Sequence, residues 1–315
     1  MAEKLEGMNW LKNQIKKIEI SNSRFGEIIK ELALIYPGVY NKFESWTPLK
    51  LILLNYAFDV CSTIINKSFF KRKYYVDLFA GSGINIMRGT SDLLMGSPFI
   101  TALMHGDKYN KMFFCESENK LFSALKARVD FLRKNNLECW HGDSNNNLDN
   151  ILKIINEEKS SYSFFFVDPY TTEFSWNSMK KILNIHSDIV FTLMTSQIIR
   201  IIGLAKTNPK ESTDLILDNF FGDNSWRDVK SAEDISKLYQ KNILKERKDA
   251  MMRIIKIKSA KYNFSYEIIF ITNKTKKECP WLKAIDTAKK EIEGQSDKAV
   301  ELAMDIIKQR QQTLA

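Results

Sequence analysis

The sequence has few of the residues that build metal sites and disulfide frameworks. Its 315 residues include only four cysteines and three histidines. None of the cysteines has a Cys-x-x-Cys spacing or a pair of histidines nearby; they are Cys61, Cys115, Cys139 and Cys279. We therefore expect a reducing, cytoplasmic setting with free and mostly buried thiols, and we expect no metal site.

Long apolar runs are also missing. No window approaches the roughly 18 uninterrupted apolar residues of a membrane span. The first 20 residues are charged and amphipathic, unlike a secretory signal. Hydrophobic residues nevertheless make up 44% of the chain and aromatic residues 12%, which is too much for a disordered protein. The composition predicts a folded protein with a sizeable core and no association with a membrane.

The net charge of +9 is concentrated in one part of the chain. Residues 241–290 contain 14 lysines and arginines but only five acidic residues, whereas the rest of the chain has 33 of each kind. Such a local excess is either a solvated face of a lysine-rich protein or a surface for a polyanion such as nucleic acid. The sequence leaves both interpretations open.

Short apolar runs alternate with helical patterns after a start that has the pattern of helices. These runs are typical of parallel strands that are buried on both faces: Tyr74–Phe79, Met112–Glu116, Glu138–His141, Phe164–Val167 and Ile189–Met194. Two later runs, Arg253–Lys258 and Tyr266–Thr272, are too close for a crossover helix and should form an antiparallel hairpin. We predict a doubly wound α/β domain at 73–275, a helical extension packed on it at 1–72, and a helical tail at 276–315.

The clearest signal of a site is the segment Tyr75–Gly83, with the sequence YVDLFAGSG. A strand ends at Asp77, and Gly81 and Gly83 then allow a tight turn and a close approach to a ligand. The carboxyl end of the first strand is a common ligand site in open α/β sheets. A carboxylate at Asp77 would repel a pyrophosphate but suits the ammonium group of an amino-acid moiety. The third glycine of the dinucleotide fingerprint is also missing, and an ordinary glycine turn is the alternative.

Two further strand ends carry acidic residues. Glu116 ends the second strand, where a carboxylate can accept hydrogen bonds from both hydroxyls of a ribose, although a solvent-exposed strand end is the alternative. Asp143 and Ser144 follow the third strand, where Asp143 either accepts a hydrogen bond from an adenine amino group or caps the next helix. Asp77 and Glu116 are 39 residues apart, longer than a compact βαβ unit requires, so we expect residues 88–98 to form a loop insertion.

The fourth strand delivers Asp168, Pro169 and Tyr170 to the same edge of the sheet. The proline disfavours a helical conformation at Asp168 and stiffens the loop. An acid and an aromatic ring at this place can orient a nucleophilic amine and stack a base, and we predict these three residues as catalytic. A strand-ending turn with a packed tyrosine is the alternative.

Together these residues resemble the motif series of class I S-adenosylmethionine-dependent methyltransferases: DLFAGSG, Glu116, Gly142 with Asp143, and Asp168–Tyr170. Further features over roughly residues 46–275 resemble the three-Cys-motif partner protein family. They are the helix around Lys50, the GSP turn at 96–98, Trp176, Ser196 with Arg200, and the late strand YEIIFIT.

The resemblance implies a Rossmann-like sheet of seven strands with an antiparallel last hairpin, and S-adenosylmethionine as the cofactor. It assigns the methionine part of the cofactor to Asp77, Gly81 and Gly83, the ribose to Glu116 and the adenine to Asp143. We add Phe79, Ala80 and Ser144 as neighbouring cofactor contacts. The family also implies a protein partner with a three-cysteine motif. The chain departs from one related pattern. Amino-methyltransferases that modify bases usually have a second proline after the Asp-Pro pair, whereas here Tyr170 follows Asp168 and Pro169.

Three functions follow from these patterns. The leading hypothesis is methyl transfer to a nucleic acid, RNA or DNA. The second is a non-catalytic or regulatory cofactor-binding subunit that works with a cysteine-motif partner protein and carries an exposed apolar patch. The third, a nucleotide-dependent oxidoreductase, is disfavoured by Asp77 and by the missing glycine.

Overall fold

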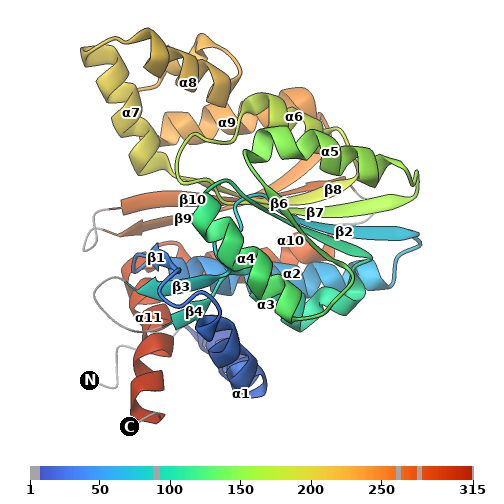
Figure 1. Cartoon of the computed structure of the whole chain (residues 1–315). Coiled ribbons are helices and arrows are strands. Elements are labelled where there is room, and N and C mark those ends of the chain that lie inside the picture. The colour runs from blue at the N-terminus through green and yellow to red at the C-terminus, as the bar shows by residue number, and fades with distance from the viewer. Residues whose placement is uncertain (1–7, 88–92, 260–263, 275–278, 314–315) are drawn as a thin grey trace.

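The computed structural model describes residues 8–87, 93–259, 264–274 and 279–313 (Figure 1). A seven-stranded sheet lies at its centre, with the order β6-β5-β2-β7-β8-β10-β9. Five strands are parallel: β2 (Arg72–Asp77), β5 (Lys111–Glu116), β6 (Leu137–His141), β7 (Ser161–Val167) and β8 (Ser187–Leu193). β10 (Phe264–Asn273) runs antiparallel to both β8 and β9 (Ala250–Ser259). The predicted Rossmann-like α/β sheet with an antiparallel last hairpin is confirmed.

Helices cover both faces of the sheet (Figure 1). One face packs against α5 (Ser144–Asn156), α6 (Trp176–Leu183), α7 (Thr195–Thr207), α8 (Glu211–Phe221) and α9 (Ala232–Glu246). The other packs against α1 (Asn9–Leu34), α2 (Thr47–Asn66), α3 (Ser97–His105), α4 (Asn119–Phe131), α10 (Pro280–Ile292) and α11 (Ser296–Thr313). Alternate side chains of one strand enter different layers: Phe164 and Phe166 of β7 face the second set of helices, and Phe165 faces the first. This explains why the central strands are continuous apolar runs.

The helix α2 is the one described helix that is long and apolar enough to cross a membrane. Two thirds of its most apolar window (67%) is buried inside the protein, so α2 is a core helix. Lys50 is its only basic residue and lies in its first turn. This position brings a cation from the N-terminal part of the chain to the edge of the sheet.

The expected loop insertion is instead part of a second, small sheet. β3 (Ile84–Met87) and β4 (Leu93–Met95) form an antiparallel hairpin, and β1 (Asn41–Phe43) pairs with β3 in parallel. Residues 88–92 of the expected loop lie outside the described residues. The expectation that the first 72 residues are entirely helical is also wrong at β1. Strands of three or four residues are too short to show a periodicity in the sequence, and β1 is held by a partner more than 40 residues away.

The helices α1, α10 and α11 meet on one face of the sheet. The expected helical tail consists of two helices, α10 and α11, separated at Gly294, whose φ is +86°. The carboxylate of Glu291, on α10, accepts hydrogen bonds from the amides of Trp10 and Leu11 at 2.8 and 3.1 Å. It therefore satisfies two of the free amides in the first turn of α1.

Candidate functional site

The strand ends that carry the predicted site residues meet at one edge of the sheet. The amide of Ala80, in the loop after β2, donates to the carbonyl of Cys115 on β5 at 2.8 Å. The amide of Gly142, after β6, donates to the carbonyl of Glu116 at 3.0 Å. The parallel register places the end of β7 beside the end of β2. The structure thus brings together four acidic residues that are far apart in the sequence: Asp77, Glu116, Asp143 and Asp168.

Asp77 is fully buried at the end of β2. Its Oδ1 accepts a hydrogen bond from the amide of Phe79 at 3.2 Å, whereas its Oδ2 has no hydrogen-bond partner. Burial raises the pKa of Asp77 to about 7, although the Ser97 hydroxyl and the Phe79 amide act to lower it, and the nearby carboxylates of Asp168 and Glu116 raise it slightly further. A buried carboxylate with one free oxygen is costly unless a cation or donor reaches it.

The glycine loop has a left-handed backbone at two positions. Gly81 has a φ of +60° and Gly83 a φ of +76°. A Cβ at Gly81 would lie 1.9 Å from Nδ2 of Asn41, and a Cβ at Gly83 would lie 2.2 Å from the ring of Phe99. The chain itself therefore requires both glycines. The Asn41 side chain, and not an open space, lies where a Cβ of Gly81 would be. The contact of the two glycines with a cofactor stays a prediction.

Glu116 and Asp143 lie at the ends of β5 and β6. Glu116 accepts a hydrogen bond from the amide of Glu118 at 2.7 Å, and burial raises its pKa against the effect of nearby backbone amides, which include that of Gly81. Asp143 caps α5, since its Oδ1 accepts from the amides of Asn145 and Asn146. This is one of the two roles that the sequence left open for Asp143, and its Oδ2 takes no part in the cap. Ser144 is the buried first residue of α5.

A cavity of about 340 Å³ lies beside the glycine loop. Its lining includes Phe79, Ala80, Ser97, Asp168, Pro169 and Tyr170. Five predicted site residues from two segments that are far apart in the sequence, 79–80 and 168–170, therefore line the same cavity. Tyr170 is 75% exposed, so its ring is not packed in the core and lies open at the mouth of the cavity.

Lys50 is a further site residue, which the sequence alone did not predict. Its Nζ lies 2.6 Å from Oδ2 of Asp168, and the two side chains are only 13% and 19% exposed. This ion pair joins the first turn of α2 to the catalytic candidate at the end of β7. A signal was present in the sequence, because Lys50 is the one basic residue of an otherwise apolar helix. The sequence could not identify its partner, which is 118 residues away.

Two amide side chains complete the cavity wall. Gln197, in the first turn of α7, lines the cavity, and its Oε1 is buried without a hydrogen-bond partner. Asn41, on β1, also lines the cavity, and its Oδ1 accepts from the amide of Ser82 at 2.7 Å. Among the described residues, no group of three or more His, Cys, Asp and Glu side chains is arranged to hold a metal ion.

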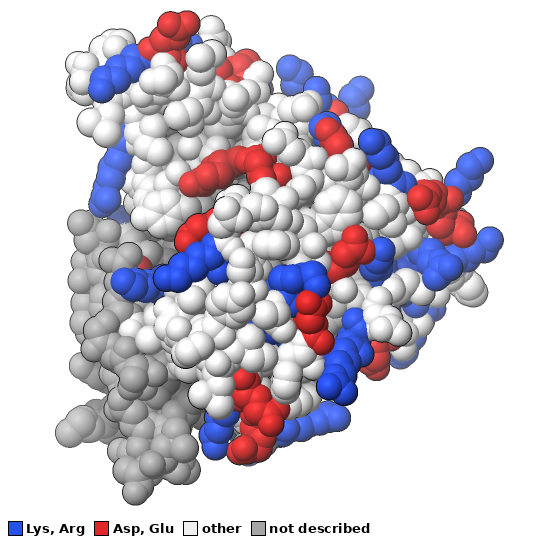
Figure 2. Space-filling model, viewed as in Figure 1, with Lys and Arg blue, Asp and Glu red and all other residues white. Residues whose placement is uncertain are grey.

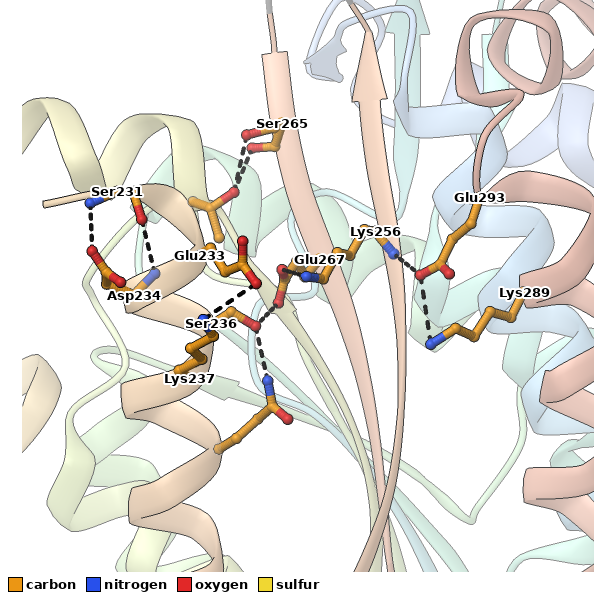
Figure 3. Close-up of polar contacts among 12 residues, drawn as sticks. Ser231, Glu233, Asp234, Ser236, Lys237, Lys256, Ser265, Glu267, Lys289 and Glu293 are labelled. Carbon is orange, nitrogen blue, oxygen red and sulfur yellow. Dashed lines mark hydrogen bonds and ion pairs between the residues drawn. The ribbon is translucent and has the colours of Figure 1, made fainter. Parts of the chain in front are cut away.

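The basic segment 241–290 is partly compensated by its neighbours. Arg253 donates to Asp286 at 2.6 Å. Lys256 lies 3.9 Å from Glu267, and its backbone amide donates to Glu293 at 3.0 Å (Figure 3). On the face of the molecule shown in Figure 2, lysine and arginine side chains are interspersed with acidic ones. The described part of that face therefore carries no continuous basic surface.

The far end of the basic hairpin reaches the cavity wall. The ring of Phe264, at the start of β10, lies 4.6 Å from the ring of Trp46, which lines the cavity. The Tyr266 hydroxyl donates to the carbonyl of Trp46 at 3.4 Å. Lys258, exposed on β9, pairs in register with Ser265 and so lies at this end of the hairpin. Trp46 thus connects the basic hairpin with the Asp168 cavity.

No protein-family model matches the chain, and no curated protein matches it. Among solved structures, the protein LPL1258 from Legionella pneumophila is similar with a TM-score of 0.46 and 10% identity, over 76% of this chain and 91% of that one. An rRNA methylase from Streptococcus thermophilus gives a TM-score of 0.36 and 11% identity over 69% and 95%. Trm5b from Pyrococcus abyssi gives 0.34 and 12% over 69% and 49%. These similarities are loose, so the function has to be inferred from the chain's own residues.

Proposed function

We propose that the chain is an S-adenosylmethionine-dependent methyltransferase whose acceptor belongs to a nucleic acid, either RNA or DNA. The observation that carries this proposal is the buried carboxylate of Asp77, whose Oδ2 has no partner at the start of a left-handed glycine loop. The ammonium group of an amino-acid moiety supplies both the positive charge and the donors that this oxygen lacks. A pyrophosphate would be repelled at the same place, which argues against a nicotinamide cofactor.

The other strand ends fit the remainder of this cofactor. Glu116 has a carboxylate for the ribose hydroxyls, next to the amide of Gly81. Asp143 would reach the adenine through Oδ2, since Oδ1 is engaged by the start of α5. Phe79, Ala80 and Ser144 are assigned as neighbouring contacts.

The bound cofactor would supply a methyl group that is already activated on a sulfonium. The chain's own residues then need to hold the acceptor in line and to exclude water. Asp168 is assigned to accept a hydrogen bond or a proton from the acceptor, and Lys50 to hold that carboxylate in place at 2.6 Å. Pro169 fixes the loop, and Gln197 offers a buried acceptor, Oε1, to a polar group of the substrate.

The choice of a nucleic acid as acceptor is supported by the surroundings of the cavity. Tyr170 presents an open aromatic ring at the mouth, and bases stack on such rings. Lys42 is exposed and lines the same cavity, and Lys258 lies on the hairpin that contacts Trp46. Cations around an aromatic ring are typical of surfaces that bind single-stranded nucleic acid.

A regulatory subunit that binds the cofactor and acts with a cysteine-motif partner is the alternative. It is favoured by apolar side chains that lie open at the end of α1, where Leu34 is 76% and Tyr36 47% exposed. Such side chains mark a surface that a second protein can cover. Under this alternative the chain binds the cofactor but transfers no methyl group unless the partner is present.

The decisive experiment is a calorimetric titration of the chain with S-adenosylmethionine, S-adenosylhomocysteine and NADH, repeated on Asp77→Ala. We expect micromolar binding of the first two ligands, none of NADH, and loss of binding in the variant. Glu118→Ala is a matched control, since it removes a carboxylate two residues beyond Glu116. If the folded wild-type chain binds neither of the first two ligands, the cofactor assignment is wrong.

The acceptor is tested separately by binding of single-stranded RNA and DNA oligonucleotides at several salt concentrations. A nucleic-acid surface predicts that affinity falls steeply with salt. Tyr170→Ala should weaken binding by about tenfold, the cost of losing one stacked base, and Phe69→Ala, which removes an exposed ring just before the start of β2, should not. Binding that is insensitive to both salt and Tyr170 would exclude a nucleic acid as the acceptor.

A further inference from the structure

Arg128, on α4, is a completely buried cation that holds backbone carbonyls only. Its guanidinium donates to the carbonyl of Ser82 in the glycine loop at 2.7 Å. It also donates to four carbonyls at the end of α1 and just after it, at 2.9 to 3.3 Å: those of Leu32, Ile35, Tyr36 and Val39. Among the described residues, no carboxylate lies within ion-pair distance of it. Burial lowers the pKa of Arg128 to about 10, so it stays charged at neutral pH.

The segment that Arg128 holds is shaped for this contact. Tyr36 has a φ of +56°, a left-handed conformation that is unusual for a tyrosine and that persists only where neighbouring groups enforce it. The guanidinium also lies 5.4 Å from the ring centre of Tyr40, whose hydroxyl donates to the carbonyl of Ala33. The chain turns here so that several carbonyls converge on one side chain.

The same segment continues into β1 and reaches the glycine loop a second time. Oδ1 of Asn41 accepts from the amide of Ser82, and its Nδ2 fills the place where Gly81 lacks a side chain. Both backbone polar groups of Ser82 are therefore held by polar side chains from outside the loop. Asn41, which accepts from the Ser82 amide, belongs to the N-terminal segment. Arg128, which donates to the Ser82 carbonyl, also binds carbonyls of that segment.

We propose that residues 32–43 are part of the cofactor site, and that Arg128 and Asn41 are positioning residues that fix the glycine loop in its ligand-binding shape. This inference rests on the proposed function. The arrangement, called here the Arg128 clasp, consists of Arg128, Asn41 and Ser82. The shape of the glycine loop thus depends on residues 32–43, which precede the first strand of the seven-stranded sheet.

The chain contains a matched control for this idea. Arg247, at the end of α9, is 6% exposed and holds the carbonyls of Ile182, Leu183, Ile185 and Ser187 at 2.6 to 3.2 Å. Burial lowers its pKa to about 10 as well. These carbonyls lie between α6 and the start of β8, at the opposite end of the strands from the glycine loop. Arg247 has the same chemistry as Arg128 and no contact with the proposed site.

The test compares Arg128→Lys, Asn41→Ala and Arg247→Lys by two measurements at a temperature where each variant is folded. The first is hydrogen exchange of the peptide that covers residues 78–87. We expect this exchange to be about tenfold faster in Arg128→Lys, which weakens a charge-assisted hydrogen bond, severalfold faster in Asn41→Ala, which loses a neutral one, and unchanged in Arg247→Lys. The second is the dissociation constant of S-adenosylhomocysteine, which should rise by about tenfold in the same two variants only.

The outcomes separate the clasp from the proposed function. If the wild type binds S-adenosylhomocysteine and the three variants bind it equally well, the clasp is wrong and the proposed function stands. If Arg247→Lys weakens binding as much as Arg128→Lys, the effect is general destabilisation and the clasp is also wrong. If the wild type does not bind the ligand, the proposed function fails. Faster exchange in Arg128→Lys and Asn41→Ala would then show only that these residues stabilise the glycine loop. The inference that residues 32–43 belong to a cofactor site would also be wrong.

Discussion

Two aspartates of the same sheet are completely or almost completely buried, but their surroundings differ. Asp188, near the start of β8, is 8% exposed and accepts hydrogen bonds from the Tyr162 hydroxyl at 2.7 Å, from the Thr272 hydroxyl and from the Cys61 thiol at 3.7 Å. Asp77, at the end of β2, is 0% exposed and accepts one amide hydrogen bond. Burial raises the pKa of both carboxyl groups.

The difference separates a structural carboxylate from one that, under the proposed function, binds a ligand. Around Asp188 the fold supplies a donor for each oxygen, so the group is satisfied without help from outside. Around Asp77 it supplies the Phe79 amide and a nearby Ser97 hydroxyl, and Oδ2 still accepts no hydrogen bond. Unsatisfied buried groups are selected against unless they have a use, and proteins tolerate them mainly at functional sites.

The largest expected effect of this contrast is on stability as a function of pH. The pKa of Asp77 is about 7 in the folded chain and close to 3.8 when unfolded, so the folded chain binds more protons between these values. Its contribution to stability is therefore present below about pH 4 and is lost as the pH rises through 7. Asp77→Asn should remove this loss and raise the free energy of unfolding at pH 8 by up to about 4 kcal/mol. Urea unfolding of both proteins at pH 5 and pH 8 measures it, and an equal effect of the substitution at both pH values would contradict the assignment.

The next effect is a difference between two alanine variants. Asp188→Ala leaves two hydroxyls and a thiol without their acceptor, whereas Asp77→Ala leaves one amide. We expect Asp188→Ala to be about 2 kcal/mol less stable than Asp77→Ala at pH 5, where the folded chain has Asp77 protonated, since each unsatisfied buried donor costs about 1–3 kcal/mol. Thermal unfolding of the two variants side by side gives the difference. Equal losses would mean that the two carboxylates have the same role.

The smallest effect concerns the pH dependence of ligand binding. With a pKa of about 7, only about one tenth of the free chain has an ionised Asp77 at pH 6. S-adenosylhomocysteine should therefore bind roughly tenfold more weakly at pH 6 than at pH 8. Asp188→Asn should keep this dependence if it folds, and Glu118→Gln provides a control that leaves both buried aspartates in place. Affinity that does not change with pH would show that Asp77 does not face the ammonium group.

The sequence predicted the sheet because its strands are local patterns. Phe164–Val167 is an apolar run that ends in an acid, and such runs are recognisable without knowing their neighbours. The acids at the strand ends were found for the same reason, since each follows a strand directly. The topology of the sheet then places them together.

The sequence did not reveal contacts that join distant segments. Lys50 meets Asp168 across 118 residues, and Arg128 meets Ser82 and the end of α1 across 46 and 96 residues. The pattern of α2 shows a lysine on an apolar helix but not the carboxylate that it faces. β1 has three residues, and its pairing with β3 follows from tertiary packing, not from its own propensity.

The hydrogen bonds of Glu291 to Trp10 and Leu11 bear on the order in which the chain folds during its synthesis. The first turn of α1 leaves the ribosome early, but the carboxylate that satisfies its amides is made about 280 residues later. Until then α1 lacks this contact and the apolar residues of α10 and α11 against which it packs. The helix α1 therefore gains its last contacts only after α10 and α11 have been made, although α2, which it also contacts, is synthesised much earlier.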